Sequence, residues 1–146
     1  MIREKVVEGT SSPIPAFTPR DVRIPAVPNK AFAVIGLRRA GKTTFLWQVA
    51  QQHIQSGAPR EHVLYFNFED ERLLDLKVGD LQLIVETYYE MYPQAREQIQ
   101  TLFLLDEIQQ VAGWEVFARR LLDTENLRLF FSGSSARMLA YEVGTS

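Results

Sequence analysis

Eight residues from Gly36 to Thr43, G-L-R-R-A-G-K-T, have the types and the spacing that phosphate chemistry requires. They match the pattern G-x-x-x-x-G-K-[ST], in which backbone N–H groups of a glycine-rich loop surround phosphate oxygens. Lys42 is expected to reach the β- and γ-phosphates of a nucleotide, and Thr43 to offer its hydroxyl to Mg²⁺. The alternative is a glycine-rich turn that binds nothing. The candidate nucleotide-binding residues are Gly36, Arg38, Arg39, Ala40, Gly41, Lys42, Thr43 and Thr44.

Two of these candidates, Arg38 and Arg39, are placed in the middle of the loop. A solvent-exposed role is favoured for both, and contact with a phosphate or a partner is the alternative.

A pair of carboxylates, Asp106 and Glu107, directly follows the apolar run T-L-F-L-L. An acidic residue at the carboxyl end of a buried strand faces the ligand crevice of a doubly wound sheet. Asp106 is therefore expected to hold Mg²⁺ through water, and Glu107 to polarise the attacking water as a general base. The alternative is that both are simply solvated at a strand end. Loop and carboxylates together indicate hydrolysis of a nucleoside triphosphate, not binding alone.

The apolar run L-R-L-F-F ends at a third polar group, S-G-S-S. A hydroxyl at this point can contact the γ-phosphate or the attacking water, the role called a sensor. Ser132 and Ser134 are the candidates, and a helix N-cap at Ser134 or Ser135 is the alternative.

Four short stretches rich in apolar, β-branched and aromatic residues, at 31–35, 62–68, 101–105 and 127–131, are typical of strands. Between them, apolar residues at helical spacing predict three helices. One follows Gly41 and closes near Gly57, one is capped by Asp80 and is ended or kinked by Pro93, and one starts near Trp114. A last short helix is expected around 136–142. Strands alternating with helices predict an α/β fold with a parallel sheet covered on both faces, a three-layer α/β/α arrangement. The strand at 127–131 is the candidate for insertion between the loop strand and the carboxylate strand.

The chain has 146 residues and a formal net charge of −2, which fits one domain with a sizeable core. Residues 1–30 are predicted to be a proline-rich N-terminal arm, and residues 31–146 the core. The charge does not favour nucleic-acid binding, although a local basic patch remains possible. The absence of cysteine excludes disulfides and thiolate metal sites. No apolar run is long enough to span a membrane and no signal peptide is visible, so we expect no membrane partner and a cytoplasmic location.

The order G-L-R-R-A-G-K-T-T-F-L-W-Q, Y-F-N-F-E-D-E-R-L, L-F-L-L-D-E-I-Q-Q and F-F-S-G-S-S-A-R-M-L resembles the bacterial and archaeal AAA-type ATPases. The resemblance extends from about Phe17 to the C-terminus. It implies ATP and Mg²⁺ as ligands and an additional-strand P-loop fold with strand order 5-1-4-3-2. The sensor position, asparagine in many AAA+ proteins, is serine here.

Relatives in this family continue beyond the stretch E-V-G-T-S into an arginine-containing segment, a fifth strand and a further domain. The resemblance therefore implies that this chain is an N-terminal fragment, without strand five and the lid, whose partner is an absent C-terminal domain. An open edge at the loop strand would invite pairing with another chain, so a homo-oligomer is possible.

Three functions remain open at this point. The leading one is an ATPase core that couples ATP and ADP states to an attached domain or partner. The second is a P-loop kinase of a small molecule, and the third is a slow nucleotide-gated signalling or scaffold module. The adjacent glutamate in the D-E-I-Q-Q stretch favours water as the acceptor. A kinase usually has a basic lid, and no arginine-rich lid is visible in the sequence.

Overall fold

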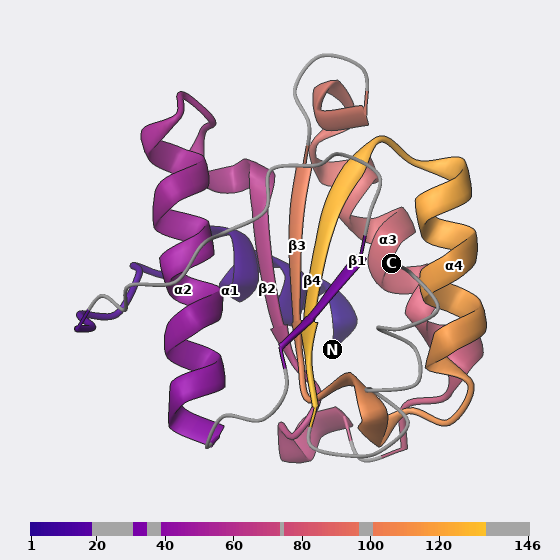
Figure 1. Cartoon of the computed structure of the whole chain (residues 1–146). Coiled ribbons are helices and arrows are strands. Elements are labelled where there is room, and N and C mark those ends of the chain that lie inside the picture. The colour runs from indigo at the N-terminus through magenta and orange to yellow at the C-terminus, as the bar shows by residue number, and fades with distance from the viewer. Residues whose placement is uncertain (19–30, 35–38, 74, 97–100, 134–146) are drawn as a thin grey trace.

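The computed structural model describes residues 1–18, 31–34, 39–73, 75–96 and 101–133. Its four strands form one parallel sheet, and Figure 1 shows helix α2 on one face of this sheet and helices α3 and α4 on the other. This is the α/β fold that the sequence predicts. The strands are β1 (Ala31–Val34), β2 (Val63–Asn67), β3 (Thr101–Asp106) and β4 (Leu127–Ser132). The helices are α1 (Ile2–Ser11), α2 (Arg39–Gln55), α3 (Val78–Met91) and α4 (Trp114–Thr124).

The strands lie in the order β1-β4-β3-β2. Strand β4 pairs in parallel with both β1 and β3, which is the neighbour relation expected for the strand at 127–131. The described residues contain no fifth strand of this sheet, so the 5-1-4-3-2 order as a whole stays a prediction. The register aligns the carboxyl ends of the strands, because Val34 lies beside Ser132 and Asn67 lies beside Asp106.

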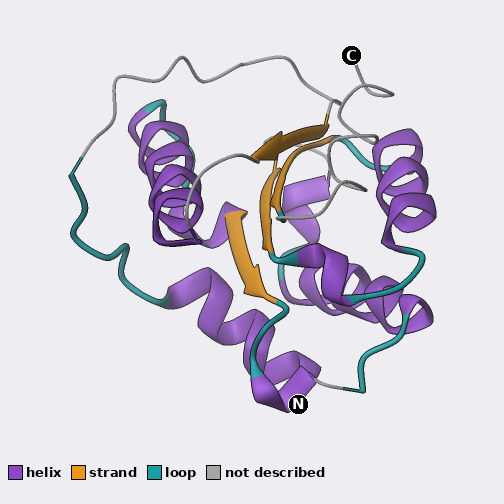
Figure 2. Cartoon of the chain, turned by 60° about the horizontal axis from the view of Figure 1, so that its bottom comes forward, coloured by secondary structure: helices purple, strands orange, loops and turns teal. Residues whose placement is uncertain are grey.

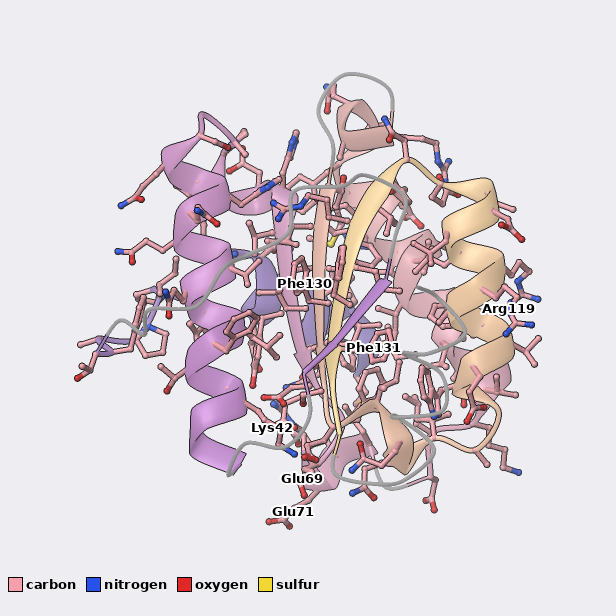
Figure 3. All side chains as sticks on the ribbon, viewed as in Figure 1. Lys42, Glu69, Glu71, Arg119, Phe130 and Phe131 are labelled. Carbon is pink, nitrogen blue, oxygen red and sulfur yellow. The ribbon has the colours of Figure 1, made fainter. Side chains whose placement is uncertain are left out.

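Alternating side chains divide the core into two layers. Phe130 packs with α2, whereas its neighbour Phe131 packs with α3 and α4, and Figure 3 shows the two rings on opposite sides of the sheet. The same alternation places Leu104 on the α2 side and Phe103 and Leu105 on the other. Strands covered on both faces are apolar along most of their length, which explains why these sequences are dense in apolar residues, although β4 also contains the buried Arg128.

Helix α2 differs at its start from the prediction and agrees at its end. It begins at Arg39, two residues before Gly41, so Arg39 belongs to the first helical turn and not to the middle of the loop. The end is as predicted, because Gly57 has a φ of +115° just after the last turn. Only glycine adopts this conformation without strain, and it closes the helix.

Helix α3 corrects the role predicted for Asp80. The N-cap is Lys77, and Asp80 stands in the first turn, where its Oδ2 accepts a hydrogen bond from the Lys77 backbone N–H at 2.9 Å. A carboxylate at the third helical position reaches back to the N-cap residue. The N-cap predicted at Asp80 was therefore three residues too late. The helix ends at Met91, immediately before Tyr92 and Pro93, as predicted.

The N-terminal segment is the largest departure from expectation. Its residues 2–11 form helix α1, which the sequence analysis did not predict, and α1 packs on β2 and α3 with Val6 fully buried. The guanidinium of Arg60 donates to the carbonyl oxygens of Gly9 (3.1 Å) and Ser12 (2.9 Å), which caps the end of α1. Lys5 binds Asp70, just beyond β2, at 2.9 Å. Proline density predicts only residues 13 onward, because the prolines begin there.

After α1, the described part of the proline-rich segment runs along the outside of α2, as Figure 2 shows. Ile14 and Phe17 pack there against the α2-side core. The remainder of the predicted arm and the predicted helix around 136–142 lie outside the described residues, and the boundary at residue 30 stays a prediction. In the described part of the chain, no helix has the length and apolar character needed to cross a membrane.

Candidate active site

The candidate site lies where the start of α2 meets the carboxyl ends of the strands. Figure 3 shows Lys42 there, with Glu69 and Glu71 from the segment after β2 at the same end of the molecule. The first N–H groups of a helix have no intrahelical partners, and the helix dipole makes this end partly positive. An anion is therefore favoured at the start of α2 before any side chain is considered.

Lys42 and Glu107 form a buried ion pair. The Lys42 Nζ lies 3.2 Å from the Glu107 Oε1, and the two residues are only 2% and 3% exposed. Moving two charges out of water costs free energy, and the attraction between the charges often does not offset that cost. A buried ion pair is therefore weak evidence for stability. Buried charges of this kind are typical of functional sites, where the lysine can exchange its partner for an incoming anion.

A second contact joins Thr43, which follows Lys42 in the chain, to Asp106, which precedes Glu107. The Thr43 hydroxyl donates to the Asp106 Oδ2 at 2.9 Å. On the other side of the carboxylate, the fully buried Ser132 hydroxyl donates to the Asp106 Oδ1. The end of β4 thus contacts the end of β3, as their adjacency in the sheet requires.

The backbone of Glu107 turns sharply at the end of β3. It has φ 58° and ψ 45°, and in the described residues it is the single non-glycine position with positive φ. A left-handed glutamate is strained, and such strain concentrates at functional sites. The Glu107 N–H donates to the Ser132 Oγ at 2.9 Å, and the Glu107 Oε2 accepts from the Gln109 Nε2 at 3.0 Å. Ser132 therefore bridges both carboxylate residues.

Tyr65 belongs to the site although the sequence analysis did not single it out. Its hydroxyl donates to the Asp106 Oδ2 at 2.5 Å. Burial, and next the neighbouring Asp106 charge, raise the pKa of the Tyr65 phenol well above its ordinary value, so it stays a donor. The sequence did contain a signal for Tyr65, because it is a tyrosine in a predicted strand, and the carboxyl end of that strand lies beside Asp106. Gln109, within the stretch D-E-I-Q-Q, was missed in the same way.

The structure brings together five of the predicted site residues. They are Lys42, Thr43, Asp106, Glu107 and Ser132. Gly41 and Thr44 lie in the first turns of α2, and the backbone of Arg39 and Ala40 starts this helix. Gly36, Arg38 and Ser134 lie outside the described residues. The roles assigned to all of these residues stay predictions.

The oxygen atoms at this site fit Mg²⁺. Mg²⁺ bound with a nucleotide is usually held by one or two carboxylates together with phosphates and waters. Asp106 and Thr43 supply a carboxylate and a hydroxyl that already touch. No group of three His, Cys, Asp or Glu side chains that could hold a metal occurs among the described residues, so a cage made of protein alone is not the arrangement found there.

The parallel sheet, the glycine-lysine pair in the first turn of α2 and the two contacts of α2 with Asp106 at the end of β3 and with Glu107 directly after it define an α/β protein with a P-loop-like fold. The family model described as an AAA domain matches residues 28–146. The chain belongs to this family, and membership indicates a nucleotide-binding, ATPase-like domain.

Three curated relatives are similar to this chain. An uncharacterized protein of Methanocaldococcus jannaschii is 36% identical over 127 residues, 87% of this chain and 26% of the relative. An uncharacterized protein of Haemophilus influenzae is 35% identical over 77% of this chain and 27% of its own length. A second M. jannaschii protein is 34% identical over 71% of this chain and 21% of its own length. The chain thus spans about a quarter of the length of these relatives. No solved structure matches it.

Proposed function

We propose that this chain binds ATP with Mg²⁺, hydrolyses it, and couples the nucleotide state to an attached domain or partner. The observation that carries the proposal is the buried Lys42–Glu107 pair beside the Thr43–Asp106 contact. A cation and a hydroxyl at the start of one helix, in contact with two carboxylates at the end of a strand, are the parts that P-loop hydrolysis uses. Family membership supports the nucleotide, and the coupling is inferred from the resemblance described above.

Each residue has a separate task in this proposal. Lys42 leaves Glu107 and contacts the β- and γ-phosphates, while Thr43 and Asp106 hold Mg²⁺. Bound Mg²⁺ neutralises the charge of the phosphates. Glu107, released by Lys42 and still oriented by Gln109, accepts a proton from a water molecule whose oxygen attacks the γ-phosphorus. The bond from that phosphorus to the ADP oxygen breaks, and inorganic phosphate and ADP result.

The first test of this proposal is a binding measurement on Lys42→Ala. Loss of a desolvated charge pair costs about 2–5 kcal/mol, so affinity for Mg-ATP should fall at least about thirtyfold in calorimetry. Lys77→Ala is the matched control, because Lys77 is an exposed lysine at the start of α3. Equal affinity in the parent chain and in Lys42→Ala would remove the basis for a phosphate site.

Phosphate release in water separates hydrolysis from kinase activity. We expect the parent chain to release phosphate without any added acceptor. Release that appears only when a small-molecule acceptor is present would support the kinase alternative. A bound-nucleotide lifetime that equals the turnover time would support a slow switch.

A further inference from the structure

Tyr65 is fixed from three directions. It lies on β2 beside Leu104 of β3, and its ring packs against Trp47 of α2 with centroids 4.4 Å apart and planes 30° apart. Helix α1 touches its backbone so closely that a Cβ atom on Gly9 would lie 2.1 Å from the Tyr65 carbonyl oxygen. The ring therefore has a defined position, set by α1, α2 and the sheet together.

Three hydroxyl groups surround the Asp106 carboxylate. Oδ2 accepts from Tyr65 (2.5 Å) and Thr43 (2.9 Å), and Oδ1 accepts from Ser132. The Thr43 hydroxyl would serve the metal as well, because it can offer a lone pair to Mg²⁺ while its hydrogen still points to Asp106. Tyr65 and Ser132 are free to keep their hydrogen bonds, one on each carboxylate oxygen.

We propose that Tyr65 is a positioning residue, which orients the Asp106 carboxylate for Mg²⁺ from the side of β2. This inference rests on the proposed function, because it assigns Asp106 to the metal. Partners that hydrogen-bond to a metal-binding carboxylate fix its orientation, and their loss typically lowers metal affinity 10–100-fold. Tyr65 contacts neither the nucleotide nor the reacting atoms in this assignment, and it acts only through Asp106.

Its test compares ATP affinity with and without Mg²⁺ in Tyr65→Phe, a change that removes one oxygen atom. Calorimetry with saturating Mg²⁺ and with EDTA gives the gain in affinity that the metal provides. We expect this gain to fall about tenfold in Tyr65→Phe, while affinity in EDTA changes less than about threefold. Direct titration of the ATP complex with Mn²⁺, followed by electron paramagnetic resonance, should show the same loss of metal affinity.

Tyr88→Phe is the matched control. The Tyr88 hydroxyl is also buried and donates at 2.8 Å, but to the Glu61 carbonyl oxygen, away from the carboxylates. Its loss should lower stability without changing the Mg²⁺-dependent gain. Comparable unfolding temperatures for the two variants would show that both are folded, so a difference between them in the Mg²⁺-dependent gain would not arise from unfolding.

Two outcomes would overturn the role of Tyr65. Both leave the Mg²⁺-dependent gain unchanged in Tyr65→Phe: in one, affinity does not change under either condition, and in the other, affinity falls equally with and without Mg²⁺, which would mean a purely structural role. By contrast, a parent chain that binds no ATP would overturn the proposed function itself, and the inference with it.

Discussion

At the scale of single residues, Glu107 has the most constrained position in the site. Its left-handed backbone is held by Ser132, and its carboxylate contacts Lys42 and Gln109. We expect Glu107→Gln to keep Mg-ATP bound while phosphate release falls about a hundredfold or more, because the amide keeps the shape but cannot accept the proton. Steady-state phosphate release and calorimetry together measure this. Glu71→Gln, an exposed change at the same end of the molecule, is the control and should leave the rate unaltered. A parental rate in Glu107→Gln would leave Glu107 as a strand-end carboxylate without a catalytic role.

At the scale of elements, helix α1 belongs to the folded unit. Gly9 permits its close approach to β2, since an added Cβ would meet the Tyr65 carbonyl oxygen and a Leu64 methyl at 2.1 Å and 2.9 Å. We expect Gly9→Ala to lower the free energy of unfolding by about 1–3 kcal/mol or more, because backbone atoms must separate. Gly79→Ala is the matched control, since nothing lies within 4 Å of its added Cβ, and in α3 it should be neutral or stabilising by up to about 1 kcal/mol. Urea unfolding measures both. A Gly9→Ala chain as stable as the parent would mean that α1 is not packed on β2 in solution.

At the scale of the whole molecule, β1 and β2 are the two edges of the described sheet, and α1 packs on β2. P-loop ATPases commonly complete their site with an arginine from elsewhere, which is worth about 10³–10⁵ in rate. Arg119 and Arg120 lie exposed on α4, and Figure 3 shows Arg119 on the side of the molecule away from Lys42. Arg128 lies buried beside His53, 3.0 Å from its Nδ1, and Arg137 is outside the described residues. None of the described arginines named here lies at the site, so we expect residues 1–146 tested alone to bind ATP but to hydrolyse it slowly, and to associate through the edge of β1 unless the proline-rich segment covers that edge.

Sedimentation velocity tests the expected association, and steady-state phosphate release tests the expected slow hydrolysis. The comparison uses the M. jannaschii relative that is 36% identical to this chain, both at full length and as the 26% of it that aligns with this chain. We expect the full-length relative to be faster than its own segment by two or more orders of magnitude, on the order of the effect of a supplied arginine. A monomeric 1–146 chain, together with a segment as active as the whole relative, would show that the remaining length is dispensable for hydrolysis.

Much of the fold and of the candidate site could be predicted from local sequence patterns. The mostly apolar stretches at 101–105 and 127–131 predicted β3 and β4 to within one residue, because strands buried on both faces are rich in apolar residues. The pair Lys42 and Thr43 was recognised because it follows a glycine-rich loop in the chain. The pair Asp106 and Glu107 was recognised because it follows the apolar run T-L-F-L-L. The end of α2 was predicted because Gly57 is a local signal as well.

The tertiary structure decided what depends on distant segments. The packing of α1 was not predicted, because Val6 and Gly9 acquire their roles only when β2 lies beneath them. Tyr65 and Ser132 reach Asp106 across 41 and 26 residues of chain, through the parallel register of β2, β3 and β4. A one-residue slip in that register would turn each side chain to the opposite face of the sheet. Local patterns determine which residues form strands, but only the packed sheet determines which hydroxyl groups meet the carboxylate.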